Sequence, residues 1–245
     1  MAAVPYKNSD RSKKGQVEEM FDQISPRYDF LNHLLSFQID KIWRRKAVKI
    51  LGHYKPATIL DVATGTGDFA IVAARLNPQR ITGIDLSEGM LKFGRKKIHK
   101  KSLESLIELR KGDSENLPFS AASFDAAIVG FGVRNFENLK AGLSEIYRVL
   151  KPGGAFIVLE FSKPRNRFFR SFYFFYFTRI LPWLGGLVSK NSRAYSYLPE
   201  SVQEFPDGDN FVRILEAVGF AKCRWFPQTF GIATIYEAQK PKNEG

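Results

Sequence analysis

At one point the chain reads Ile59-Leu60-Asp61-Val62-Ala63-Thr64-Gly65-Thr66-Gly67-Asp68-Phe69, and a second apolar run follows at Ile81-Thr82-Gly83-Ile84-Asp85-Leu86. This pattern predicts a strand, a glycine turn, a helix and a second strand that ends in an acid. The two glycines allow the backbone to turn sharply and to approach a ligand without an intervening Cβ atom. The terminal carboxylate can accept both hydroxyls of a ribose. The pattern therefore predicts a nucleoside-binding site in an α/β fold.

The glycine spacing alone fits a dinucleotide-dependent enzyme as well as a methyltransferase. Asp61 separates the two classes, because it lies one turn before Gly65 and would place a negative charge at the mouth of the first strand. Such a charge repels a pyrophosphate but suits the ammonium or sulfonium group of S-adenosylmethionine. We therefore expect a methyltransferase site, and NAD(P) binding is the alternative.

Length and composition indicate one α/β domain over residues 1–245, because 44% of the residues are hydrophobic and no linker or repeat divides the chain. The formal charge is +12, from 37 basic and 25 acidic residues. Basic runs suggest an anionic partner, either nucleic acid or a phospholipid surface. The run Lys92 to Lys101 is the exception, since it fits the solvated face of one helix.

Cysteine and histidine content bears on compartment and metal binding. One cysteine, Cys223, excludes an internal disulfide, and the three histidines show no zinc-ligand spacing, so no metal is expected. Residues 1–20 lack the apolar core of a signal peptide. Residues 168–188 are too polar to span a membrane, but their composition suits a segment that lies on the membrane surface. We expect a cytoplasmic protein with peripheral contact to the inner face of the membrane.

Hydrophobic periodicity predicts a helical N-terminal cover over 17–55 and then alternating strands and helices, which favour a mostly parallel sheet. Residues 163–205 form an aromatic and basic insertion, where we expect substrate recognition. A helix and an antiparallel closing hairpin follow, and such a hairpin favours a methyltransferase over a dinucleotide fold. The expected strands lie at 57–62, 80–85, 106–111, 123–130, 154–161, 221–226 and 232–238, and the expected helices at 68–76, 88–101, 139–150 and 207–218.

Seven motifs occur in order between Val17 and Ala238, and two of them, at 131–135 and 159–164, are far more specific than a glycine turn. They are Phe21-Asp22, Tyr28-Asp29-Phe30-Leu31-Asn32, Gly65-Thr66-Gly67-Asp68, Gly112-Asp113-Ser114-Glu115-Asn116-Leu117-Pro118-Phe119, Phe131-Gly132-Val133-Arg134-Asn135, Arg148-Val149-Leu150-Lys151-Pro152-Gly153-Gly154 and Leu159-Glu160-Phe161-Ser162-Lys163-Pro164. Together they closely resemble the menaquinone and ubiquinone biosynthesis C-methyltransferases. The resemblance implies a Rossmann-like class I fold with a seven-stranded sheet, and methyl transfer from S-adenosylmethionine to a ring carbon of a prenylated quinol. Demethylmenaquinol is the expected substrate, and a ubiquinone-pathway benzoquinol is the alternative.

The resemblance also implies where the cofactor binds. Thr66 and Asp85 would contact it, while Asp113 and Ser114 occupy the adenine-side positions of the family. Gly130 stands where some members carry a small hydroxyl residue, so only its backbone is expected to serve. The predicted cofactor-binding residues are Asp61, Gly65, Thr66, Gly67, Asp85, Asp113 and Ser114.

Methylation of carbon needs an electron-rich ring, which a hydroquinone becomes when it loses a hydroxyl proton. Arg134 is the predicted catalytic residue, because its guanidinium can stabilise phenolate charge or orient a water. The alternative for Arg134 is an ion pair with an acid such as Asp29 or Glu160. His33, Tyr195 and Tyr197 are the predicted substrate contacts, with His33 an alternative base and the tyrosines alternatively core residues.

The aromatic run 168–177 suits a membrane interface that delivers an insoluble prenyl tail, or the surface of a homodimer. Two rival functions share this fold. An RNA methyltransferase fits the positive charge, but its usual Asn/Asp-Pro-Pro-Tyr string and cysteine pairs are missing, so nucleic acid is not the expected partner. The second rival function is that of a non-catalytic scaffold, and the intact glycine turn with Asp85 argues against it.

Overall fold

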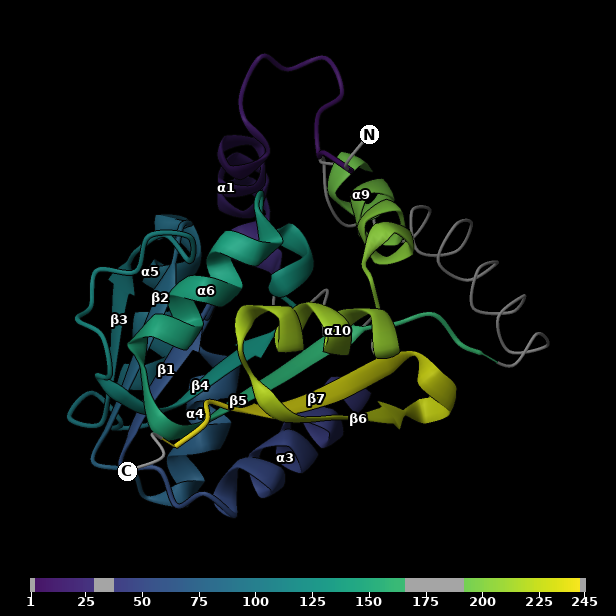
Figure 1. Ribbon diagram of the computed structural model, residues 1–245. Helices are drawn as coiled ribbons and strands as arrows, with labels where there is room; N and C mark the ends of the chain where they lie inside the picture. Colours follow the sequence, from purple (N-terminus) through teal and green to yellow (C-terminus); the bar gives the residue numbers. More distant parts are fainter. Residues whose placement is uncertain (1–2, 29–37, 166–191, 243–245) are drawn as a thin grey trace.

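The computed structural model describes residues 3–28, 38–165 and 192–242. Within them, the strands form a seven-stranded sheet with the order β3-β2-β1-β4-β5-β7-β6 (Figure 1). Strands β1 to β5 pair in parallel, whereas β7 runs antiparallel to both β5 and β6. The bounds are β1 Thr58–Val62, β2 Arg80–Asp85, β3 Ile107–Lys111, β4 Phe124–Gly130, β5 Leu150–Phe161, β6 Ala221–Gln228 and β7 Ala233–Gln239.

Helices cover both faces of this sheet, because the central strands are apolar on both sides and parallel sheets need two covered faces. On one face, α3 (Ile39–Gly52), α4 (Asp68–Ala73) and α5 (Glu88–His99) enclose a core that includes Trp43, Leu51 and Ile128. On the other face, α6 (Leu139–Val149) and α10 (Asp209–Val218) enclose a second core. The result is a three-layer α/β/α architecture with a closing hairpin, as the sequence predicted.

Local sequence signals set several of these boundaries. Ser87 precedes α5 and its Oγ accepts a hydrogen bond from the Met90 N–H, while Asn138 caps α6 in the same way. Helix α10 ends at Gly219, whose φ of 113° is accessible mainly to glycine. Short 3₁₀ turns follow α1 (η1, Ser25–Arg27), α4 (η2, Ala74–Leu76), β4 (η3, Val133–Asn135) and β6 (η5, Thr229–Gly231).

The two N-terminal helices occupy different places. Helix α1 (Lys13–Ile24) stands over the carboxyl ends of the parallel strands and packs on α5 (Figure 1). Helix α3 instead packs on α4, β5 and β7 and belongs to one layer of the core. The sequence predicted one helical cover over 17–55. In the structure, α1 lies over the strand ends, whereas α3 packs against the sheet.

Helix α9 (Ser192–Glu204) lies beside the N-terminal segment at the same edge of the sheet (Figure 1). Tyr197 of α9 is buried together with Ala3, Val17 and Met20 in a small third core. In the described ranges, no helix combines the length and apolarity needed to cross a bilayer.

Candidate active site

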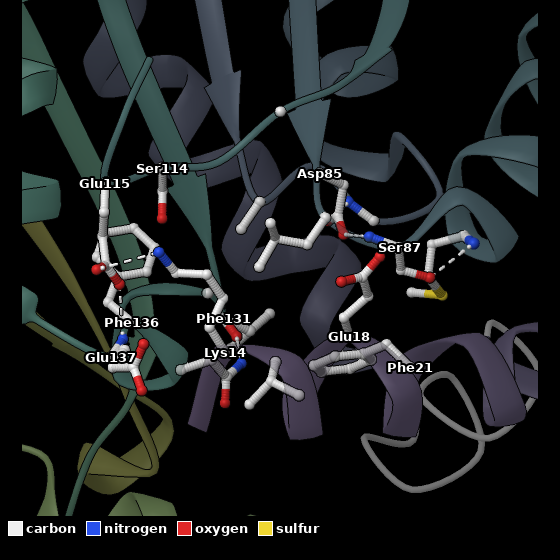
Figure 2. Close-up of a pocket in the computed structure, with 18 of the residues that line it drawn as sticks. Lys14, Glu18, Phe21, Asp85, Ser87, Ser114, Glu115, Phe131, Phe136 and Glu137 are labelled. Carbon is white, nitrogen blue, oxygen red and sulfur yellow. Dashed lines mark hydrogen bonds and ion pairs between the residues drawn. The ribbon is translucent and has the colours of Figure 1, made fainter. Parts of the chain in front are cut away.

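A cleft of about 670 Å³, counting its solvent-open part, lies at the carboxyl ends of β1, β2, β3 and β4. Helix α1 forms one wall and the loops after the strands form the other (Figure 2). The lining residues are Lys14, Val17, Glu18, Phe21, Tyr28, Ala63, Gly65, Asp85, Leu86, Ser87, Met90, Gly112, Ser114, Glu115, Gly130, Phe131, Gly132, Asn135, Phe136 and Glu137.

Asp85 ends β2 and reaches into this cleft. Its Oδ2 accepts a hydrogen bond from the Gly65 N–H at 2.8 Å, and its Oδ1 accepts one from the Ser87 N–H at 2.9 Å. Burial raises the pKa of Asp85 to about 6, and the two backbone N–H groups oppose this shift. The carboxylate is therefore held in one orientation by two loops, with acceptor capacity left for a ligand.

The glycine turn divides its residues between the cleft and the protein interior. Gly65 has a φ of 57° and lines the cleft, where an added Cβ would lie 3.2 Å from the methyl group of Met90. Gly67 has a φ of 78° and directly precedes α4. A Cβ on Gly67 would meet Ile98 and Leu109 in the core. Gly65 thus keeps the cleft wall open, whereas Gly67 permits the turn into the helix.

Thr66 is buried between these glycines, and its Oγ1 accepts a hydrogen bond from Lys97 at 2.9 Å. The same ammonium pairs with Asp68 at 2.7 Å. Neither Thr66 nor Gly67 lines the cleft wall. The Lys97 side chain ties the turn to α5, so the structure gives Thr66 a bracing contact.

Asp61 is fully buried beneath the turn. Its Oδ2 accepts hydrogen bonds from the Thr64 hydroxyl at 2.6 Å and the Ala70 N–H at 3.1 Å, while no described group pairs with its Oδ1. Burial raises the pKa of Asp61 to about 7. A buried carboxylate oxygen without a partner is costly unless a donor or cation reaches it. The charge of Arg44 opposes the rise in the pKa of Asp61, so a cation of the protein already lies near this carboxylate, which does not itself line the cleft.

The two adenine-side candidates differ in placement. Ser114 is buried and lines the cleft. Asp113 does not line it, because its Oδ2 pairs with Lys14 of α1 at 2.6 Å and its Oδ1 accepts a hydrogen bond from the Glu115 N–H. Lys14 also lies 3.4 Å from Glu115. Asp113 thus anchors α1 across the cleft.

Arg134 forms a buried ion pair with Glu160, the contact weighed as its alternative. Its Nη1 donates to Oε1 of Glu160 at 2.7 Å and to the carbonyl of Phe131, and its guanidinium lies 5.5 Å from the centre of the Phe161 ring. No described group accepts from its Nε. Arg134 does not line the cleft. Through its hydrogen bond to the Phe131 carbonyl it supports the loop that carries Phe131 and Asn135 into the cleft.

Tyr197 reaches the same loop from α9, and its hydroxyl donates to Oδ1 of Asn135 at 3.1 Å. Burial raises the pKa of Tyr197 to about 12, so it is a neutral donor at physiological pH. His33 and residues 166–191 of the aromatic insertion lie outside the described residues, and so does the side chain of Tyr195. A Cβ on Gly130 would lie 2.9 Å from the Phe69 ring, so the close approach of that ring accounts for glycine there.

Sequence reasoning missed the cleft residues contributed by α1 and by the loop after η3. Lys14, Val17 and Glu18 lie on one face of α1, at i, i+3 and i+4, and an amphipathic pattern alone does not show what that face contacts. Phe21 stood in a motif that was used only for the resemblance. Asn135 likewise lies in the motif at 131–135, which carries the resemblance but does not mark single residues as part of the cleft.

The strand order with antiparallel β7, the glycine turn after β1 and an acid at the end of β2 together define a class I S-adenosylmethionine-dependent methyltransferase fold. A solved structure titled a S-adenosylmethionine-dependent methyltransferase, possible histamine N-methyltransferase, from Thermotoga maritima matches with a TM-score of 0.64 and 19% identity, covering 91% of this chain and 99% of that one. The [4+2]-cyclase SpnF matches with a TM-score of 0.67 and 17% identity, over 94% and 97% of the two chains. These likenesses establish the fold.

The model of the ubiE/COQ5 methyltransferase family matches residues 8–240, and the chain belongs to this family. It is 47% identical to the demethylmenaquinone methyltransferase of Bacteroides fragilis, over 96% of each chain. It is also 47% identical to the ubiquinone/menaquinone biosynthesis C-methyltransferase UbiE of Geotalea daltonii, over 96% of this chain and all of that one. The fold class and the family predicted from the sequence are therefore confirmed.

Proposed function

We propose that the protein transfers the methyl group of S-adenosylmethionine to a ring carbon of demethylmenaquinol and so forms menaquinol. The observation that carries the proposal is a cleft at the carboxyl ends of the parallel strands with Asp85 at its wall, in a chain 47% identical to demethylmenaquinone methyltransferase of Bacteroides fragilis. The new carbon–carbon bond replaces the carbon–sulfur bond of the donor. The ring carbon loses its proton, and S-adenosylhomocysteine leaves.

The residues present fit the cofactor. In our proposal, Asp85 accepts the two ribose hydroxyls, the backbone at Gly65 makes room for the amino-acid part, and Ser114 with its neighbours faces the adenine. The unpaired Oδ1 of Asp61 provides negative potential for the positively charged end of the molecule. The proposed cofactor-binding residues also include Thr66 and Gly67, which shape the glycine turn, and Asp113, which holds α1 over the cleft through Lys14. The bound cofactor supplies the electrophilic methyl group.

The chain's own groups must orient the quinol and stabilise its phenolate form. Arg134 is the proposed group for the charge, because its guanidinium keeps a buried Nε without a partner behind the cleft wall. Glu160 holds that guanidinium in place. Tyr197 donates to Asn135 and thereby orients an amide that lines the cleft. Positioning of this kind can supply up to about 7–11 kcal/mol of the barrier.

Helix α1 has two tasks in this proposal. Its ion pairs and hydrogen bonds close the cleft, since Lys14 pairs with Asp113 and Asp22 accepts from the Ser87 hydroxyl at 2.5 Å and from the Gly89 N–H at 2.9 Å. The closed cleft excludes water from a charged donor. Its inner residue Val17 lines the cleft and belongs to the same buried apolar cluster as Tyr197, so α1 also ties α9 to the site.

We further propose that His33 and Tyr195 contact the quinol, as the resemblance implies. The whole chain acts as one methyltransferase domain, with recognition of the ring by the insertion at 163–205. Because a prenyl tail dissolves in lipid, the protein would work in the cytoplasm at the inner face of the membrane. A homodimer is part of this proposal, with the aromatic insertion as its contact.

One observation favours a second substrate class. The relative from Geotalea daltonii is named for both ubiquinone and menaquinone biosynthesis. Purified protein should therefore be assayed with labelled S-adenosylmethionine and, in parallel, a reduced demethylmenaquinone, a reduced ubiquinone precursor and RNA. We expect methylation of the naphthoquinol well above that of the benzoquinol, and none of RNA. Equal rates on both quinols would overturn the substrate assignment, and transfer only to RNA would overturn the function.

A further inference from the structure

The outer face of α3 carries a row of exposed basic residues. Lys41, Arg45 and Lys49 follow one another at intervals of four, and Lys46 lies beside them; all four are exposed. Ile42 is on the same face and is 50% exposed. The opposite face of α3 packs on the sheet. The helix therefore presents cations and one apolar side chain to solvent.

The β6–β7 hairpin tip adjoins this row. Trp43 Nε1 donates to the Thr229 hydroxyl at 2.9 Å, and Lys46 donates to Oε1 of Gln228 at 3.0 Å. Phe230, at the tip, is 68% exposed, and with Ile42 it makes up the exposed large hydrophobic residues of the described chain. Trp43 and Thr229 share this hydrogen bond. Ile42 directly precedes Trp43 in the chain, and Phe230 directly follows Thr229. The two apolar side chains thus lie next to one contact.

The charge of this surface is not neutralised locally. Within residues 3–28, 38–165 and 192–242, no carboxylate pairs with Lys41, Arg45, Lys46 or Lys49. The nearby acid of the helix, Asp40, is buried and paired with Arg44. A basic face with apolar residues at its edge is complementary to an anionic phospholipid surface, where cations contact headgroups and apolar side chains enter the interface.

The buried face of α3 contacts the wall of the cleft. Trp43 of α3 packs against Phe131 and Phe161, with ring centres 6.3 and 6.4 Å away. Phe131 lines the cleft, and Phe161 is the last residue of β5. Trp43 therefore joins the buried face of α3 to the cleft wall, and docking through the opposite, basic face would keep the enzyme on the bilayer in which the lipid-soluble quinol is dissolved.

We propose that Lys41, Ile42, Arg45, Lys46, Lys49 and Phe230 form a docking surface for an anionic phospholipid bilayer. None of these residues belongs to the segment 168–188, for which a membrane role was expected from the sequence. The proposal rests on the proposed function, in that a membrane-dissolved substrate gives docking its purpose. RNA could use the cations and stack a base on Phe230, but it gives the exposed Ile42 no role, so lipid is the partner that accounts for the whole surface.

The test is flotation of the full-length protein with vesicles of phosphatidylcholine alone or with phosphatidylglycerol. A cation near an anionic surface contributes roughly a factor of five to binding. The variant Lys41→Gln/Arg45→Gln/Lys46→Gln/Lys49→Gln should therefore lose at least about tenfold in binding to anionic vesicles. The matched control removes the same charge from the α5 region, as Lys92→Gln/Lys96→Gln/Lys100→Gln/Lys101→Gln, and should bind like the unmodified protein. Ile42→Ser/Phe230→Asn should weaken binding at high salt, where screening leaves the apolar contribution.

Unchanged flotation of the α3 variant, or an equal loss in the α5 control, overturns the docking surface. Capture of RNA in place of vesicles, lost in the α3 variant, overturns it as well. Methylation of a short-tailed quinol dispersed in detergent is measured on the same proteins. We expect normal turnover in the α3 variant, since none of its substituted residues lines the cleft. Absence of turnover in the unmodified protein would count against the proposed function, whatever the vesicles show.

Discussion

Replacement of Asp85 by alanine should weaken binding of the cofactor more than any other single change at the cleft wall. Both carboxylate oxygens already accept backbone N–H groups, from Gly65 and Ser87, so the side chain is fixed before the ligand arrives. Hydrogen bonds to a charged group contribute about 1.5–3 kcal/mol, which corresponds to roughly a 10- to 150-fold rise in Kd. Isothermal titration with S-adenosylhomocysteine measures this directly.

The pH dependence of the same titration gives a sharper check. Burial raises the pKa of Asp85 to about 6 in the free protein, and only the ionised form accepts hydrogen bonds with both oxygens. As the pH falls below about 6, a proton must leave before the ligand binds, so affinity should drop toward about tenfold per pH unit. Asp85→Asn should lose this dependence. Unchanged affinity in Asp85→Ala, with the protein folded by circular dichroism, refutes the ribose assignment.

Four further outcomes are expected. The pKa of Asp61 is raised by burial to about 7, so the folded state holds a proton that the unfolded state releases from about pH 4 upward; stability should fall by on the order of 1.4 kcal/mol per pH unit up to about 7. Asp61→Asn should flatten that slope in thermal melts. Arg134→Ala leaves Glu160 buried without its cation and should cost about 3–5 kcal/mol, which Glu160→Gln in the same chain should partly restore in urea titrations. Tyr197→Phe should lower kcat while the Kd of the cofactor stays constant, and a changed Kd with normal kcat would contradict the assigned place of the tyrosine. Lys97→Met releases Thr66 and Asp68 and should raise the cofactor Kd a few-fold with little change in kcat, as steady-state kinetics would reveal.

The sheet was predictable because buried parallel strands consist of nearly continuous runs of apolar residues, as in β1 and β4. Strand β5 begins at Leu150, four residues before the expected start, because its first residues pair across an irregular register with Phe124. The periodicity of α3 predicted a helix with an apolar stripe. It did not tell whether Trp43 would face the cleft or the sheet, since either surface buries the same stripe.

The site was predictable only in part. The end of a strand can be recognised from the local sequence, whereas an ion pair between residues far apart in the chain cannot. Asp85 is the last residue of β2 and Ser114 lies three residues after β3, so both lie at the carboxyl ends of parallel strands, where the cleft is. Asp113 satisfies the same rule, yet Lys14 of α1 draws its carboxylate aside. That pairing joins residues 99 positions apart, and nothing in the local pattern signals it.

The central claim is carbon methylation of a quinol, and mapping the transferred group tests it most directly. The protein is incubated with S-adenosylmethionine that carries a trideuterated methyl group and with chemically reduced demethylmenaquinone, and the product is examined by mass spectrometry and proton NMR. The account predicts a trideuterated methyl on the ring carbon, with loss of that carbon's hydrogen signal. A label on a quinol oxygen, or no label on the quinol while the protein binds the cofactor, would contradict it.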